Sequence, residues 1–256
     1  MSPQKKKIII IASIVVVALL AVSIGPFILP WGYSEEKLPV EDMHPEFNLS
    51  SMTMTYTFED GQMSAKTTNA LTGNKVKIAS MYFGLPVTAV GSKLFQGNSK
   101  LESVDIPAGV MHISSGAFAF CTGLTEIELP AILKSIDRNA FYGCTGLKSI
   151  NIPGVENVGE NAFYGCTGLE SVTLNDGVRS IEASAFENCT GIDSVTIPAS
   201  VKYIAQNAFY GCTSLSTINF AGTVEQWNMI YIETRWADET PATQVVCTNG
   251  VVDIVK

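Results

Sequence analysis

Hydrophobic positions recur along the second half of the chain with a fixed period. A column of phenylalanines repeats every 22 or 23 residues, at Phe95, Phe118, Phe141, Phe163, Phe186 and Phe209. A repeat of this length indicates stacked structural units, because one such unit cannot bury its own hydrophobic face. The pattern predicts a solenoid in which each phenylalanine packs on the phenylalanine of the next unit.

Each unit also contains two short apolar patterns. The first is a pair of apolar residues one position apart, followed in most units by proline, as in Ile150, Ile152 and Pro153. The alternation predicts a strand with one buried face, and the proline ends it because it has no N–H for the ladder. A second pair, such as Val155 and Val158, predicts a return leg. We expect the strands of successive units, including one at 127–129, to pair in parallel.

The ends of the array are expected to differ from its middle, because a terminal unit lacks one neighbour. Within residues 51–75, a stretch of apolar residues alternates with threonine and leads to Asp60 and Gly61. This pattern predicts a β-hairpin. We expect this hairpin to be an N-terminal cap. Val76 begins an opening unit with a longer loop at 81–86, and Asn249-Gly250 predicts the last turn of a C-terminal cap, 231–256.

The repeated line itself resembles a known family. Ala140–Leu147 recurs unchanged at Ala162–Leu169 and with one change at Ala208–Leu215. This pattern, with its alternating strand and proline, resembles the BspA-like class of leucine-rich repeat found in surface proteins of bacteria, some archaea and some protists. The resemblance covers 76–230. It implies an α/β-type repeat solenoid with a parallel β-sheet on one face, and a place at the cell surface.

The N-terminal segment predicts one transmembrane helix. Three lysines, Lys5–Lys7, precede a run at 8–30 that has no charged residue and is long enough to cross a bilayer. The lysines favour a cytoplasmic stub, 1–7, and extracellular repeats, so we expect a single-pass signal-anchor in the plasma membrane. A cleaved secretory signal ending near Ser23 is the alternative, and it would make the protein secreted. Residues 31–50, acidic and containing two prolines, predict a stalk linker.

Five of the six cysteines occupy the same place in successive units. They are Cys121, Cys144, Cys166, Cys189 and Cys212. We expect free, buried thiols that act as small apolar side chains, because a regular stack does not supply the disulfide dihedral angle. The column has no CxxC spacing and no nearby histidine, so neither a metal nor another cofactor is expected. Cys247 lies outside the column and is the best candidate for a reactive or partner-linked thiol.

The sequence gives no support for catalysis. The two histidines, His44 and His112, have no partner that the repeat would place beside them, and we expect both on the solvated surface. No nucleophile elbow or phosphate-binding glycine loop occurs. A net charge of −8 also argues against a nucleic-acid partner, which would need a basic patch. We therefore expect a protein that is not an enzyme.

The outward side chains beside the predicted strands form the candidate partner-binding face. They are polar and become acidic toward the N-terminal half: Glu102, Asp105, Glu126, Glu128, Lys148, Asn151, Glu170, Thr173, Asp193 and Thr196. Repeat proteins of this kind offer extended binding surfaces. Two hypotheses follow, namely a recognition or adhesion module for an extracellular protein or glycan, and a passive structural component of the cell surface with no specific ligand.

Overall fold

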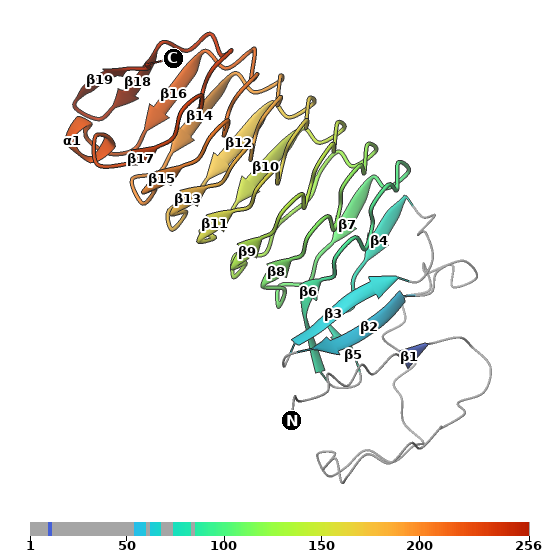
Figure 1. The fold of residues 1–256 in the computed structure, drawn as a ribbon. Helices are drawn as coiled ribbons and strands as arrows, with labels where there is room; N and C mark the ends of the chain where they lie inside the picture. The colour runs from blue at the N-terminus through green and yellow to red at the C-terminus, as the bar shows by residue number, and fades with distance from the viewer. Residues whose placement is uncertain (1–9, 12–53, 60–61, 68–73, 83–84, 256) are drawn as a thin grey trace, which may run out of the picture.

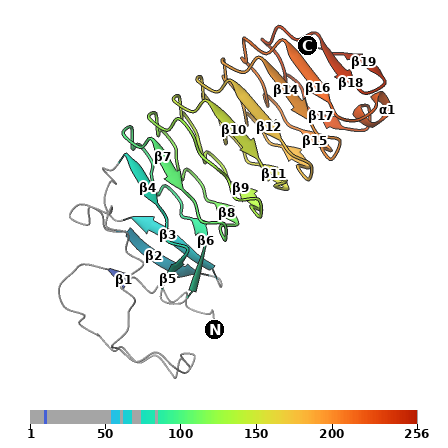
Figure 2. The same cartoon turned by 180° about the vertical axis from the view of Figure 1, so that it is seen from behind.

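The chain winds into an elongated coil whose turns lie side by side (Figures 1 and 2). A computed structural model describes residues 10–11, 54–59, 62–67, 74–82 and 85–255. The N-terminal strands lie at one end of the coil and the C-terminus at the other (Figure 1). The solenoid predicted from the spacing of the phenylalanines is confirmed.

The first ladder of strands follows the predicted alternating segments. Its strands are β4 (Lys75–Lys77), β7 (Ser103–Asp105), β10 (Ser149–Ile152), β12 (Ser171–Leu174), β14 (Ser194–Ile197), β16 (Thr217–Phe220) and β18 (Gln244–Cys247). β4 pairs in parallel with β7. The strands β10, β12, β14, β16 and β18 form a second parallel set in the predicted register, with Ile150 beside Val172. In β10, β12 and β14 exposed and buried residues alternate, which confirms one buried face.

The return legs form a second ladder of parallel strands. It contains β6 (Leu85–Val90), β8 (His112–Ile113), β9 (Ser135–Ile136), β11 (Asn157–Val158), β13 (Ser180–Ile181), β15 (Tyr203–Ile204) and β17 (Tyr231–Ile232). In the described part of the chain the one helix is the four-residue α1 (Val224–Trp227). The expected α/β-type fold with a parallel sheet on one face is therefore corrected to a β-solenoid. In the described units the segment that follows each second-ladder strand is a series of turns.

The predicted strand at 127–129 is wrong. The structure has no strand there, and β7 and β10 consequently lie in separate sheets. Main-chain bonds to Thr125 still tie this turn to its neighbours, from Thr125 N to Glu102 O at 3.2 Å and from Lys148 N to Thr125 O at 3.1 Å. Glu128 occupies the same column as Asp105, and like charges on adjacent strands weaken their pairing.

Six phenylalanine rings form the spine of the core. Successive rings lie 5.0 to 5.2 Å apart between centroids and within 12° of parallel. The stack ends on Trp236, whose ring meets that of Phe209 edge-on at 6.3 Å. Each phenylalanine is at most 1% exposed. Burial of such a side chain is worth about 1.5–3 kcal/mol, so the spine supplies much of the stability of the array.

The cysteine column lies beside this spine and is buried, as predicted. Each Sγ donates a hydrogen bond to the main-chain oxygen of the phenylalanine in the preceding unit, as from Cys166 to Phe141 at 3.1 Å. The cysteine side chain is therefore small enough to fit beside the phenylalanine spine, and its S–H also donates a hydrogen bond to a main-chain carbonyl. Cys247 is buried too, and burial raises the pKa of its thiol, which argues against a reactive thiol at this place.

The predicted N-terminal hairpin is present as β2 (Met54–Glu59) and β3 (Gln62–Thr67), which pair antiparallel. β3 pairs in parallel with β6 and so extends the second ladder, while β5 (Met81–Tyr82) pairs antiparallel with β6 in the opening unit. The role of the hairpin as a cap stays a prediction.

Two residues of the run at 8–30 belong to the described chain, and they form β1 (Ile10–Ile11) on the otherwise open edge of β2. The rest of that run, the stub at 1–7, the stalk at 31–50 and His44 lie outside the described residues. None of the helices in the described ranges is long and apolar enough to span a bilayer. The transmembrane anchor stays a prediction.

At the C-terminal end both ladders continue before the chain turns back. β17 pairs with β15 and β18 with β16, and β19 (Gly250–Asp253) then pairs antiparallel with β18 around the predicted Asn249-Gly250 turn. Thr223 caps α1: the N–H of Gln226 donates to Thr223 Oγ1 at 3.3 Å, and the N–H of Thr223 donates to Gln226 Oε1 at 2.9 Å. This capping box fixes the start of the last turn.

Candidate functional site

The structure describes all ten residues predicted to form the partner-binding face, and eight of them lie beside strands of the first ladder as predicted. Each is exposed, and each lies in the first ladder or directly before one of its strands, except Glu126 and Glu128, which lie in the irregular turn between β7 and β10. The parallel register sets Asn151, Thr173 and Thr196 in one row along the solenoid. We call this surface the strand face. Its role in binding stays a prediction.

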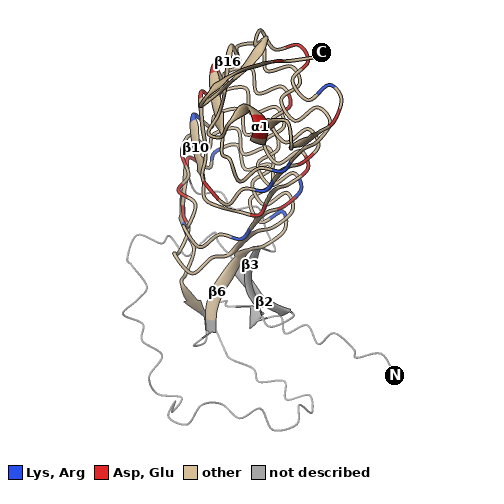
Figure 3. Ribbon diagram, turned by 90° about the vertical axis from the view of Figure 1, so that its left-hand side faces the viewer, with Lys and Arg blue, Asp and Glu red and all other residues tan. Residues whose placement is uncertain are grey.

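Some charged residues of the strand face form ion pairs and others do not. Lys77 Nζ lies 3.1 Å from Asp105 Oδ2, and Lys148 Nζ lies 3.3 Å from Glu170 Oε1. Both pairs are exposed and contribute about 0–1 kcal/mol each. Among the described residues no ion pair involves Glu126 or Glu128. Figure 3 shows acidic and basic segments distributed along the turns of the solenoid. The acidic part of the strand face thus keeps charge that an incoming cationic group could meet.

An open depression adjoins this acidic part. It is lined by Asn74, Ser99, Lys100, Glu102, Gly123 and Thr125. Asn74 Nδ2 donates to Glu102 Oε1 at 3.1 Å, so the amide orients one carboxylate at the edge of the depression. The depression gives the strand face a concave margin near its N-terminal end.

His112 has a partner that the sequence analysis missed. It lies half-buried on β8, and its Nδ1 is 3.0 Å from Ser135 Oγ on β9. The partner follows from the parallel register, which sets His112 beside Ser135. Within the described ranges no group of three or more histidine, cysteine or acidic side chains is arranged to hold a metal ion.

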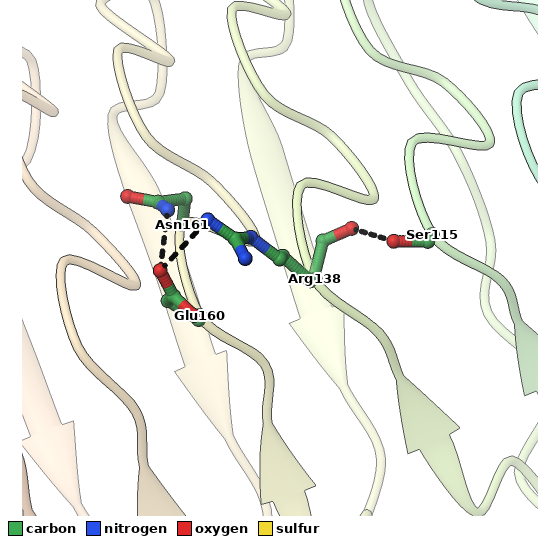
Figure 4. A network of polar contacts seen from close by, with 4 residues as sticks. All are labelled: Ser115, Arg138, Glu160 and Asn161. Atoms are coloured by element: carbon green, nitrogen blue, oxygen red, sulfur yellow. Dashed lines mark hydrogen bonds and ion pairs between the residues drawn. The ribbon is translucent and has the colours of Figure 1, made fainter.

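A polar cluster ties consecutive turns together beyond the second ladder (Figure 4). Arg138 Nη2 lies 3.1 Å from Glu160 Oε1, which also accepts a hydrogen bond from Asn161 Nδ2 at 3.3 Å. Ser115 Oγ donates to the main-chain oxygen of Arg138 at 2.9 Å. The cluster joins three successive units through exposed groups, and its charges balance.

An exposed aromatic row on the turns was also missed by the sequence analysis. Phe120, Tyr142 and Tyr164 lie on consecutive units, and Phe120 is 49% exposed. The sequence signal that could have found it is Phe120 itself, which stands in the column where Gly143 and Gly165 occur.

The stacked units, the phenylalanine spine and the parallel ladders define a β-solenoid of the leucine-rich repeat class. The model of the BspA type leucine rich repeat region matches residues 68–159 and 134–233, with six copies. The chain therefore belongs to the BspA-type leucine-rich repeat family, as its resemblance indicated. This is a repeat family, and the match indicates no catalytic activity.

Solved structures of bacterial proteins share the fold. A leucine-rich repeat protein of T. pallidum is 34% identical, with a TM-score of 0.58, over 61% of this chain and 73% of that one. A leucine-rich repeat protein of Eubacterium ventriosum is 26% identical, with a TM-score of 0.59, over 77% of this chain and 54% of that one. A leucine rich cell surface protein of Faecalibacterium prausnitzii is 26% identical, with a TM-score of 0.53, over 79% and 57%. No curated protein matches the sequence.

Proposed function

We propose that the protein is a membrane-anchored extracellular recognition or adhesion module, which binds a protein or glycan partner through the strand face. The observation that supports this most is the exposed acidic pair Glu126 and Glu128, which lies where the first ladder is interrupted and has no ion-pair partner among the described residues. Carboxylates without a partner on a rigid scaffold favour a ligand that brings cationic or hydrogen-bonding groups. The likeness to a bacterial cell surface protein supports the extracellular setting.

The proposal is tested with a pair of charge-reversal variants that change the net charge equally. The first carries Glu126→Lys and Glu128→Lys on the strand face. The second carries Glu156→Lys and Asp176→Lys, both exposed and both in the segments that follow β10 and β12 rather than among the ten residues of the strand face. Binding of the full chain to immobilised extracellular matrix proteins and glycans is measured for the wild type and for each variant.

We expect the strand-face variant to lose the binding that the wild type shows, and the second variant to keep it. Rim charges act mainly on association rates, so the loss should be largest at low salt. Equal binding by both variants would count against the strand face as the site. If the wild type binds none of the immobilised ligands, the passive structural role becomes the better account.

The membrane anchor is the part of this proposal that rests on the run at 8–30. A chain expressed in a bacterium should sediment with the membranes, and added protease should digest its repeats in intact cells. Release of the protein into the medium, with a new N-terminus near Ser23, would favour a cleaved signal instead.

A further inference from the structure

Most of the exposed large apolar side chains of the described chain lie in the last turn of the solenoid. They are Met229, Tyr231, Val246, Val251 and Val255. Elsewhere in the described ranges, the exposed large apolar side chains are Met81, Phe120 and Ile132. A terminal unit has no neighbour on one side, and solenoids usually cover that side with polar groups. Apolar groups that gather there indicate an interaction surface.

β19 is the edge strand of the sheet that ends in this turn. The sheet runs from β10 to β19, and among the described strands β19 pairs with β18 alone. The N–H of Ile254 donates to the main-chain oxygen of Thr243 at 2.8 Å, so the main-chain groups of Ile254 point toward the segment that leads into β18. Direction alternates along an antiparallel strand, and the N–H and C=O groups of Val251 and Asp253 therefore point away from β18. An edge of this kind is a template for another strand.

On the outer face of the sheet, β18 and β19 present two valines side by side. Val246 lies opposite Val251 in the hairpin, and the two residues are 44% and 53% exposed. Val252 has the opposite orientation and packs against the core. Within 250–255 the single charged residue is Asp253, and no lysine or proline is present to protect the edge. β19 therefore offers a partner both free main-chain groups and an apolar face.

The residues of β19 suit antiparallel pairing with a second copy of the same strand, in which every contact forms twice about a two-fold axis. With Val251 opposite Val251 of the second copy, the outward main-chain groups meet, and Val246 and Val251 of both copies form one apolar row across the outer face. Asp253 then lies opposite Asn249 of the second copy. The two Asp253 carboxylates are about 14 Å apart along the strands, beyond the Debye length of about 8 Å at physiological salt. Shifting one strand by two or four residues would bring them to about 7 Å or directly opposite each other, and like charges so placed weaken strand pairing.

We propose that β19 is a self-association surface, through which two copies of the chain pair at their C-terminal ends with Val251 opposite Val251. The sheet from β10 to β19 would then continue from one solenoid into the other. The second ladder ends at β17, at the same end of the solenoid (Figure 1), where Met229 and Tyr231 are exposed. The contact does not depend on the proposed anchor, which belongs to the opposite end of the chain. With that anchor in place, the pairing would join chains from two facing surfaces.

Cysteine trapping on the full chain in detergent micelles tests this register. Opposite residues of a hydrogen-bonded antiparallel pair have Cα atoms about 5.5 Å apart, which is within the range of a disulfide. Val251→Cys should therefore become mostly disulfide-linked dimer with oxidised glutathione, as seen on non-reducing gels. Asp253→Cys, about 14 Å from its copy, should stay mostly monomeric. So should Ile132→Cys, since Ile132 is 52% exposed in an inner turn, and the wild type gives the background from the six buried native cysteines.

Sedimentation velocity of the full chain measures the association without a cross-link. Val251→Pro removes one outward N–H and should leave the pairing with β18 intact, because proline is tolerated on the open side of an edge strand. We expect Val251→Pro and Val251→Lys each to raise the dimer dissociation constant at least about tenfold, with melting temperatures near that of the wild type. Ile132→Lys is the matched control and should dimerise like the wild type. A monomeric wild type, unchanged association of both Val251 variants, or equal trapping at positions 251 and 253 would each overturn the proposal.

Discussion

Replacing Phe163 by alanine should destabilise the solenoid more than the same change at the end of the phenylalanine spine. Phe163 is fully buried and stacks on two rings, on Phe141 at 5.1 Å and on Phe186 at 5.2 Å. Phe95, the first ring of the column, stacks on Phe118 alone among the described rings. The two sites thus differ in the number of ring contacts and match in burial.

The magnitude follows from burial and from those contacts. Truncation of a buried phenylalanine costs about 3–5 kcal/mol, because the burial is lost and a cavity remains. Each ring contact adds about 0.5–1.5 kcal/mol beyond burial. We therefore expect a loss near 4 to 5 kcal/mol for Phe163→Ala, and about 1 kcal/mol less for Phe95→Ala. Fraying of the terminal unit should reduce the cost at Phe95 further, since a repeat contacts only its neighbours.

Urea unfolding followed by circular dichroism measures both values. At an m-value of about 2 kcal/mol per molar, a loss of about 4 kcal/mol lowers the midpoint by about 2 M. Ile132→Ala is the control, because Ile132 is 52% exposed and its truncation should cost less than about 0.5 kcal/mol. Equal losses at Phe163 and Phe95, or a loss at Phe163 near that of Ile132, would refute the stacking argument.

Three smaller predictions follow from other contacts. Gly143→Ala should lower the urea midpoint, because φ there is 68° and the new Cβ would lie 3.0 Å from Phe120 Cδ1; an unchanged midpoint would contradict this. Lys148→Met should cost less than about 1 kcal/mol, because its pair with Glu170 is exposed. Burial raises the pKa of Cys121 from 9.0 to about 12, so unfolded chains lose this proton first. The contribution of the buried Cys121 thiol to the stability of the fold is complete below about pH 9 and declines toward pH 12. Iodoacetamide at about pH 8 should alkylate Cys121 only when urea unfolds the chain.

The sequence predicted the spine and the strand register because both depend on residues that recur at fixed intervals. A period read from Phe141 and Phe163 sets which side chains meet, and the parallel pairing of Ile150 with Val172 follows from it. The second ladder was not predicted as a sheet. Two apolar residues per return leg leave open whether the chain between them is a strand or a turn, and the main-chain bonds between units decide it.

The strand face could be placed from the sequence because outward positions alternate with buried ones. The aromatic row could not, because its geometry depends on a backbone torsion. Tyr142 and Tyr164 share one column, whereas Phe120 lies one place later, in the column of Gly143. With a left-handed backbone at that place, the ring of Phe120 lies 5.1 Å from that of Tyr142.

Both departures from the repeat fall in a single unit. Phe120 strains the turn of this unit, and Glu126 and Glu128 accompany the break in the first ladder a few residues later. Neither departure favours stability, since a left-handed phenylalanine costs about 1–3 kcal/mol and like charges weaken strand pairing. The unit can carry these costs because the stacked phenylalanines and the main-chain bonds on both sides hold its backbone in place. A solenoid built from uniform columns therefore gains its distinct surfaces where one unit differs from its neighbours, and this unit is where a search for ligands should begin.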